Sequence, residues 1–226
     1  MIRAFVGAGG KTTWIRRYAE KYLAQGKKVF VTTSTHMYVE NDTLLTDNAD
    51  EIIDHLESRH YVMAGIREGE KIRALSLNTY EKVCRHADEV LIEADGSRHL
   101  PLKYPNAEEP VIYDNVDEII IVCGMHALHQ KAAKAIHRFE LAEKCLEIGN
   151  DVELEPIHIQ TLIRKGYVET LREKYPEKNV WAWSGFKFDK DLKDKEVTKY
   201  LDVLVDGQYV DELHNPTLKW KGSSNN

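Results

Sequence analysis

The amino-acid sequence predicts an α/β protein built around a mainly parallel, doubly wound sheet. Two observations favour this fold. Apolar runs of strand length alternate with segments of helical periodicity, and a glycine-rich turn joins the first strand directly to the first helix. Strands and helices that alternate at this spacing are typical of parallel sheets covered by helices on both faces.

The first strand, the first helix and the second strand form one complete unit. Residues 2–6 have the pattern of a buried strand, 14–25 that of a helix and 28–33 that of a second strand. Gly26 ends the helix. The helix carries one apolar stripe, which consists of Ile15, Tyr18, Ala19, Tyr22 and Leu23.

The alternation continues through the rest of the chain. Further strands are expected at 60–64, 88–94 and 118–123, and further helices at 49–58, 77–86, 125–135, 139–146 and 156–165. Two last strands at 179–183 and 202–205, joined by a short helical stretch, predict a small C-terminal β-α-β extension. Ligands of such sheets bind at the carboxyl ends of the strands. We therefore expect four segments to line one edge: 7–13, 32–36, 93–98 and 123–125.

Composition limits the class of protein. A chain of 226 residues, 42% of them hydrophobic, can form one core with, at most, a small appended domain. The net charge of −6 comes from interspersed acidic and basic residues, which argues against nucleic-acid binding. No apolar run approaches the ~18 residues of a membrane span. The first strand begins at residue 2, so no signal peptide is expected, and we predict a cytoplasmic protein that contacts no membrane.

The three cysteines predict no metal cluster. Cys84, Cys123 and Cys145 are widely separated, and no Cys-x-x-Cys spacing occurs. The sequence therefore predicts neither a zinc site nor a cysteine-ligated iron–sulfur cluster, and free cysteines fit a reducing compartment.

The segment from Gly7 to Thr13, Gly-Ala-Gly-Gly-Lys-Thr-Thr, predicts a phosphate-binding loop. Glycines let backbone N–H groups point at a polyphosphate, and the start of the following helix adds partial positive charge. Lys11 would reach the terminal phosphates, and the Thr12 hydroxyl would bind Mg²⁺. The loop is shorter than the standard eight-residue pattern, because Phe5 stands where the first glycine would be.

A plain glycine turn is the alternative, and the strand–loop–helix–strand context favours the phosphate site. We expect a P-loop-like domain that binds ATP or GTP with Mg²⁺. The binding residues would be Gly7, Gly9, Gly10, Lys11, Thr12 and Thr13.

Two carboxylates lie at the end of the strand expected at 88–94. Glu93 and Asp95 would lie beside the phosphate loop, where a phosphate-bound Mg²⁺ needs oxygen ligands. One would hold the metal and the other would orient a reacting group; the residues alone do not say which does which. The alternative is that Asp95 belongs to a turn and that Glu93 is a solvated rim residue.

Other polar segments leave alternatives open. The hydroxyls from Thr32 to Thr35 could bind phosphate, water or Mg²⁺, or could be a threonine-rich strand end followed by a helix cap. The proline-rich loop at 100–110 includes Lys103, which could pair with an anionic ligand or could be a surface lysine. His126 and His129 are expected on the surface.

Several blocks occur in an order that resembles the YqeC-type accessory proteins of selenium-dependent molybdenum hydroxylases. The blocks are 6–13, 31–35, 92–97, 100–103 and 109–112, and the resemblance covers about residues 1–170. It implies a nucleotide-binding protein that helps to mature a molybdenum hydroxylase or to insert its cofactor. By position, it implies that Gly7, Gly9, Gly10, Lys11 and Thr12 bind phosphate and that Asp95 serves the metal.

The remainder, about residues 171–226, resembles the C-terminal part of the radical-SAM protein that activates anaerobic ribonucleoside-triphosphate reductase. The blocks that carry this resemblance are 178–186, 200–207 and 218–225. The activating protein's cluster-binding cysteine motif is absent, so the resemblance implies no radical chemistry for this chain.

The sequence thus predicts a nucleotide-binding domain at 1–170 and an activase-like extension at 171–226. The predicted function is that of a nucleotide-dependent accessory protein, with Lys11, Glu93 and Asp95 as the residues of any catalysis and Thr12 and Asp95 as metal ligands. One alternative is a partner-binding fragment that docks on the anaerobic reductase. Another is a small-molecule kinase with Lys103 and Glu93 near the acceptor.

Overall fold

Eight parallel strands form the central sheet of the computed structural model, which describes residues 1–183, 189–190, 193, 198–199 and 201–205. All its neighbouring strands run parallel. Across the sheet the order is β13 (Val203–Val205), β12 (Asn179–Trp183), β10 (Glu118–Val122), β1 (Ile2–Gly7), β8 (Glu89–Glu93), β2 (Val29–Thr33), β5 (Tyr61–Ala64) and β4 (Thr43–Leu44). The α/β fold with a mainly parallel sheet is therefore confirmed.

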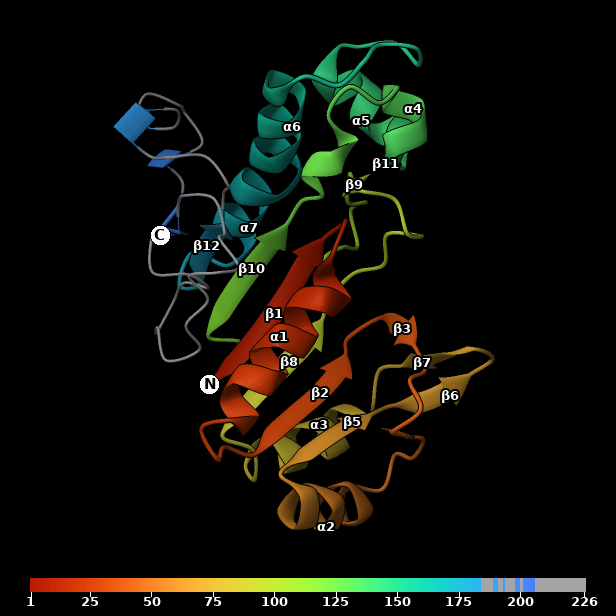
Figure 1. Ribbon diagram of the computed structural model, residues 1–226, viewed down its shortest axis with the longest axis vertical. Helices are drawn as coiled ribbons and strands as arrows, with labels where there is room; N and C mark the ends of the chain where they lie inside the picture. Colours follow the sequence, from red (N-terminus) through yellow and green to blue (C-terminus); the bar gives the residue numbers. More distant parts are fainter. Residues whose placement is uncertain (184–188, 191–192, 194–197, 200, 206–226) are drawn as a thin grey trace.

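Helices cover both faces of this sheet, because successive side chains of each buried strand point to opposite faces. Phe5 packs with helix α1 (Lys11–Leu23) on one face, whereas Val6 belongs to the core on the other. The second face is covered by α2 (Ala49–Arg59), α3 (Leu77–Cys84) and α6 (Pro156–Ile163). Figure 1 shows α1 crossing in front of the sheet, with α2 at one end of the molecule and α6 beside β10.

Strand β1 lies where the direction of winding reverses. The chain leaves β1 through α1 towards β2 on one side, and later places β10 against the opposite side of β1. In open parallel sheets such a reversal leaves a crevice at the carboxyl ends of the strands. The residues that follow β1, β8 and β10 meet there.

Two small sheets flank this edge, and the sequence pattern did not predict them. One consists of the short antiparallel strands β3 (His36–Tyr38), β7 (Lys71–Arg73) and β6 (Ile66–Glu68). The other pairs β9 (Leu102–Lys103) with β11 (Ile136–His137), next to α4 (Ala132–Ala135) and α5 (Phe139–Leu146). Figure 1 shows them on different sides of the β1 carboxyl end.

Two predicted helices differ from the structure. The helix expected at 125–135 is a 3₁₀ turn, η1 (Met125–Ala127), followed by an extended link and α4, because the link hydrogen-bonds with Leu154 instead of continuing the helix. The helix expected to end at residue 165 continues from α6 through a π-helical segment, η2 (Arg164–Val168), into α7 (Glu169–Lys174). Gly166 does not stop it, since this glycine packs against Tyr104 and Pro105.

The C-terminal strands extend the main sheet, as expected. β12 pairs with β10, and β13 pairs with β12. The predicted division at residue 170 falls within α7, and it stays a prediction. Most of the helical stretch expected between β12 and β13 lies outside the described residues.

Candidate functional site

The loop between β1 and α1 has the conformation that its glycines allow. Gly7, Gly9 and Gly10 have φ values of 93°, 77° and 138°, which L-amino acids with side chains rarely adopt. A Cβ on Gly7 would overlap the carbonyl oxygen of Val122, and one on Gly9 would lie 2.6 Å from the carbonyl oxygen of Pro101. The loop is therefore pressed against β10 and its neighbours on one side.

The other side of this loop presents free donors. The Ala8 N–H donates to the Val122 carbonyl at 2.8 Å, and the Trp14 N–H donates to the Gly10 carbonyl at 3.0 Å. Between them, the N–H groups of Gly9 through Thr13 donate to no group in the described part of the chain. They stand at the N-terminus of the 13-residue helix α1, where the helix dipole favours an anion.

Lys11 is held inside this loop. Its Nζ donates to the Gly7 carbonyl at 2.6 Å and lies 3.0 Å from Asp95 Oδ1. Asp95 follows β8 and is fully buried, so it does not belong to a solvated turn. Its other oxygen, Oδ2, accepts the Gly7 N–H at 2.9 Å and the Tyr167 hydroxyl at 3.0 Å. Asp95 thus positions both the loop backbone and its lysine.

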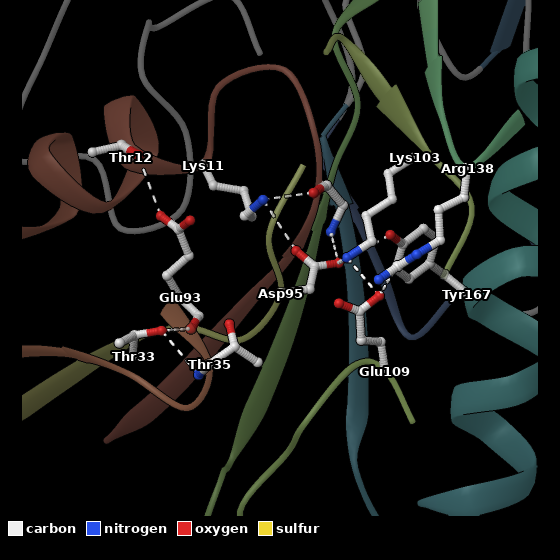
Figure 2. Close-up of polar contacts among 11 residues, drawn as sticks. Lys11, Thr12, Thr33, Thr35, Glu93, Asp95, Lys103, Glu109, Arg138 and Tyr167 are labelled. Atoms are coloured by element: carbon white, nitrogen blue, oxygen red, sulfur yellow. Dashed lines mark hydrogen bonds and ion pairs between the residues drawn. The ribbon is translucent and has the colours of Figure 1, made fainter. Parts of the chain in front are cut away.

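A buried chain of charges continues from Asp95 towards β9 and β11. Lys103 Nζ lies 3.5 Å from Asp95 Oδ2 and 2.7 Å from Glu109 Oε2, and Glu109 also pairs with Arg138 Nη1. Figure 2 shows Lys11 and Lys103 approaching Asp95 from opposite sides. The interpretation of Lys103 as a surface lysine is wrong, because its side chain is fully buried between the two carboxylates.

Burial and neighbouring charges shift the pKa values of this chain. Burial lowers the pKa of Lys103, against the opposing effect of Asp95 and Glu109. Burial acts to raise the pKa of Glu109, but Arg138 and Lys103 outweigh it and lower that pKa below its usual range. Burial, followed by the Asp95 charge, raises the pKa of Tyr167 well above that of free tyrosine. Tyr167 therefore remains a hydrogen-bond donor to Asp95.

Glu93 ends β8 on the other side of Lys11. Its Oε2 accepts the Thr12 hydroxyl at 3.2 Å, and the residue is only 8% exposed, so it is not a solvated rim residue. Burial raises the pKa of Glu93, the Asp95 charge adds to this, and Lys11 and Thr12 oppose it. The structure therefore brings Thr12 together with Glu93, and Lys11 together with Asp95 (Figure 2).

Most of the hydroxyls at and just beyond the end of β2 serve the fold. Thr32 donates to the Ala64 carbonyl, Thr33 to the Glu93 carbonyl and Ser34 to the Val111 carbonyl. The helix cap that was the alternative explanation is absent, because β3 begins at His36. The buried Oγ1 of Thr35 has no hydrogen-bond partner among the described residues, and Thr35 borders the cleft.

A cleft of about 790 Å³ opens over these residues. It is within the size range of small-molecule and cofactor sites. The loop residues Gly9 to Thr13 line it. It is also lined by residues of β3, β6 and β7 with Glu93 and Thr35, and by Arg98, His99, Leu100, Glu109, His126, His137 and Arg138. The His99 ring stacks on Tyr38 of β3, with the ring centroids 5.0 Å apart.

Sequence reasoning missed three residues of the site. Glu109 and Arg138 join it through ion pairs between a loop and the residue after β11, which no local motif announces. Tyr167 reaches Asp95 from the π-helical segment η2, and π-helical segments often occur at functional sites.

Two features are absent from the residues that the structure describes. No helix there combines the length and apolar character needed to cross a membrane. His, Cys, Asp and Glu side chains in that part of the chain form no group of three or more suited to hold a metal ion by themselves.

Comparisons with known proteins divide the chain into two parts. Residues 152–226 match a family model described as a 4Fe-4S single cluster domain. The anaerobic ribonucleoside-triphosphate reductase-activating protein of Haemophilus influenzae is 36% identical over 81 residues, which are 35% of this chain and 51% of that protein. The corresponding protein of phage T4 is 46% identical over 59 residues, 26% of this chain and 36% of its own length. This chain thus spans about half or less of these two relatives.

The residues present do not fit the cluster that this model's name implies. Residues 152–226 contain no cysteine, and iron–sulfur clusters are held by cysteine thiolates. Cys84, Cys123 and Cys145 lie outside the matched segment, and each is a free cysteine on a separate part of the fold. Residues 152–226 are therefore similar in sequence to this family, but they lack the cysteine ligands that would hold the cluster.

The first part of the chain matches a different family. YqeC of Escherichia coli K12, described as an uncharacterized protein, is 28% identical over 189 residues, which are 72% of this chain and 67% of that protein. No solved structure shows significant similarity to the chain. The family model described as YqeC protein matches residues 3–140, more than half of the sequence, and the chain therefore belongs to the YqeC family.

Proposed function

We propose that this protein binds a Mg²⁺–nucleotide, ATP or GTP, at the loop between β1 and α1, and that its β1–loop–α1–β2 unit is a compact P-loop. The row of free N–H groups from Gly9 to Thr13 carries the proposal. Each is a hydrogen-bond donor at a helix N-terminus, and Lys11 lies among them. The cleft above them has room for a nucleotide.

The roles of the side chains follow from their placement. Lys11 would exchange its contact with the Gly7 carbonyl for the β- and γ-phosphates, while Asp95 orients it. Thr12 and Glu93 supply a hydroxyl and a carboxylate oxygen 3.2 Å apart, a donor set that suits Mg²⁺. When bound, the metal would offset phosphate charge. Few protein ligands are needed, because phosphates and water complete its coordination.

The placement favours Glu93 over Asp95 as the carboxylate nearest the metal. Sequence reasoning paired Thr12 with Asp95, but Lys11, Lys103, Tyr167 and the Gly7 N–H surround Asp95 in the structure. We assign Asp95 the positioning of Lys11. Lys11, Glu93 and Asp95 remain the residues that we propose for any nucleotide turnover.

Calorimetric titration with ATP, GTP and CTP, with and without Mg²⁺, tests nucleotide binding. Lys11→Ala should weaken binding about a hundredfold, because it removes a charge-assisted contact to phosphate. Lys82→Ala is the matched control, since the exposed side chain of Lys82 on α3 pairs with Asp50 of α2, and neither residue lines the cleft. Equal affinities for the two variants, or no binding by the unaltered protein, would refute the proposal.

We further propose that nucleotide binding serves the maturation of a molybdenum hydroxylase. Membership of the YqeC family and the resemblance to its accessory proteins support this role. In a strain that lacks the gene, the unaltered chain should restore hydroxylase activity, and Lys11→Ala should not. Full restoration of hydroxylase activity by Lys11→Ala would show that the maturation role does not require nucleotide binding.

The similarity to reductase-activating proteins favours a second candidate, docking on the anaerobic reductase without radical chemistry. Deleting β12 would remove part of the main sheet, so the full chain is the proper probe. Binding of the full chain to the reductase, undiminished in Lys11→Ala, would support this function. The absence of binding at micromolar concentrations would exclude it.

A further inference from the structure

Basic residues line the cleft next to β9 and β11 and extend, through His99 stacked on Tyr38, to β3. We call Arg98, His99, His126, His137 and Arg138 the basic wall; all five line the cleft. They come from three separate segments: the loop after β8, the turn after β10, and the end of β11. The whole chain has a net charge of −6, so this concentration of basic groups is local.

The two arginines of the basic wall differ in how they are held. Arg138 is half-buried, and its Nη1 pairs with Glu109, which is itself held by Lys103. Its Nε and Nη2 donate to no other described residue. Arg98 is exposed and forms no ion pair or hydrogen bond through its side chain within the described chain. Both arginines therefore keep donors available to the cleft.

Three residues of the basic wall also have an unusual backbone conformation. Arg98, His99 and Arg138 have φ values of 48°, 62° and 61°, in the left-handed region that non-glycine residues rarely occupy. Such conformations persist only where the surrounding structure enforces them, and they concentrate at ligand sites. Three of the six non-glycine residues with positive φ in the described chain line this one wall.

The wall creates a positive local potential. Burial lowers the pKa of His137, and the charges of Arg138, Lys103 and Arg98 lower it further, against a smaller effect of Glu109. His137 is therefore a neutral hydrogen-bonding group among cations. A positive field of this kind, inside a cleft, attracts an anionic ligand.

The basic wall is separate from the phosphate loop. Lys11 and Arg138 are linked only through Asp95, Lys103 and Glu109, so two carboxylates and a lysine lie between the two cationic groups (Figure 2). The loop has its own lysine and its own N–H groups for a polyphosphate. The cations of the wall are therefore available to a different anion.

We propose that the basic wall binds a second ligand, a small molecule that carries a phosphate or carboxylate group, in the same cleft as the nucleotide. Arg98 and Arg138 bind the anionic group, and His137 contributes a neutral hydrogen bond. This inference rests on the proposed function only in counting the nucleotide as the first ligand, since the basic wall does not depend on the loop to bind its anion. The protein would then bring a nucleotide and an anionic substrate together.

Titration of the full-length protein with inorganic phosphate, and separately with acetate, tests this site. Each probe is titrated with and without saturating Mg²⁺–nucleotide. Arg98→Ala should weaken phosphate binding to the nucleotide-saturated protein about tenfold, because one charge-assisted contact is lost. Arg59→Ala, an exposed residue at the end of helix α2 and away from the cleft, is the matched control and should leave phosphate binding unchanged (Figure 1). Tighter phosphate than acetate binding identifies the phosphate class, and the reverse the carboxylate class.

Lys11→Ala separates this inference from the proposed function. If the unaltered protein binds no nucleotide, the proposed function fails. The Lys11→Ala variant should nevertheless still bind phosphate, and the double variant with Arg98→Ala should lose this binding. Arg138→Gln gives a second variant, whose folding is checked by circular dichroism. The proposal is overturned if neither anion binds, if Lys11→Ala alone abolishes binding, or if Arg98→Ala weakens nucleotide and phosphate binding equally.

Discussion

Two buried charge networks occupy opposite ends of the parallel strands, and they differ in how completely they are satisfied. At the amino ends, Arg3 of β1 donates from Nη1 to Glu89 at 2.5 Å and from Nε to Glu118 at 2.6 Å, between the neighbouring strands. Its guanidinium also lies over the Tyr22 ring, 5.1 Å from the centroid. The carboxyl-end network runs from Lys11 through Asp95, Lys103 and Glu109 to Arg138.

The carboxyl-end network contains buried polar atoms that form no hydrogen bond, whereas the amino-end network contains none of this kind among the described residues. Asp95 Oδ1 and Lys103 Nζ lie within ion-pair distance of their partners but without hydrogen-bond geometry, and no side-chain atom of Arg3, Glu89 or Glu118 is left in this way. The carboxyl-end network also borders the cleft and the free loop donors. Buried charge alone is thus weak evidence for a functional site, whereas incompletely satisfied charge beside a cleft favours the site that we propose at the carboxyl end.

The largest expected effect comes from breaking the amino-end network. Arg3→Met should lower the free energy of unfolding by about 5 kcal/mol, because Glu118 is left as a buried charge without its partner. Nucleotide binding should be unaffected in the folded fraction. Urea denaturation measures the change, and Arg16→Ala, which removes an exposed pair with Glu40, should cost less than ~1 kcal/mol.

A smaller loss is expected at the other end. Lys103→Met should lower the free energy of unfolding by about 3 kcal/mol, since Asp95 keeps Lys11 and Glu109 keeps Arg138 as cationic partners. Denaturation of this variant beside Arg3→Met gives the comparison directly. If Lys103→Met lowered the free energy of unfolding more than Arg3→Met, the remaining cations would not compensate for the loss of Lys103, and this explanation would be wrong.

Removing the π-helical contact should have a weaker effect. Tyr167→Phe loses the hydroxyl donor to Asp95 and should lower the free energy of unfolding by about 1.5 kcal/mol, because the Gly7 N–H and the lysines remain. Tyr80→Phe, which removes a hydroxyl bond to the neutral Asn115, is the control and should cost about 1 kcal/mol or less. Equal losses of unfolding free energy in the two variants would show that the hydrogen bond to Asp95 is no stronger than one to a neutral acceptor.

The smallest expected stability change is a gain. Because burial raises the pKa of Glu93 above the ordinary 4.5, the folded state holds this proton to a higher pH than the unfolded chain does. The contribution of Glu93 to the free energy of unfolding is therefore fully present below pH 4.5 and is lost as the pH rises through the raised pKa. Glu93→Gln should raise the thermal unfolding midpoint at neutral pH and have no such effect well below 4.5.

The same substitution tests function. On the proposed function, Glu93→Gln should weaken Mg²⁺-dependent nucleotide binding about tenfold or more, because the carboxylate beside Thr12 is lost. A lower midpoint at neutral pH, or unchanged Mg²⁺ dependence, would contradict the role given to Glu93. Glu68→Gln, at the exposed edge of the cleft, is the matched control.

Local patterns predicted the framework of the fold well. The stripe of Ile15, Tyr18 and Tyr22 is buried on α1, and the strand expected after Asp88 is β8. These elements are long and periodic, so their sequence alone specifies them. The strands β3, β6 and β7 have only three residues each and show no period to detect.

The side chains of the site were harder to predict because charged residues are usually exposed. Lys103 stands in a proline-rich loop that favours a surface position, yet Asp95 and Glu109 compensate its charge in the interior. Tyr167 lies beyond a glycine that predicts a helix end, yet the helix continues through η2. The Arg138–Glu109 and Tyr167–Asp95 contacts join residues 29 and 72 positions apart in the chain, and no local pattern encodes them.

The sequence by itself determined the α/β class, the order of the main strands and helices, and a glycine loop with Lys11 and Thr12 at the start of a helix. These features depend on short-range periodicity and on the conformational freedom of glycine. Only the tertiary structure decided that Glu93 faces Thr12, that Asp95 holds Lys11, and that Arg98 and Arg138 share one wall. Such pairings arise when distant segments converge at the carboxyl edge of the sheet, so their geometry exists only in the folded chain.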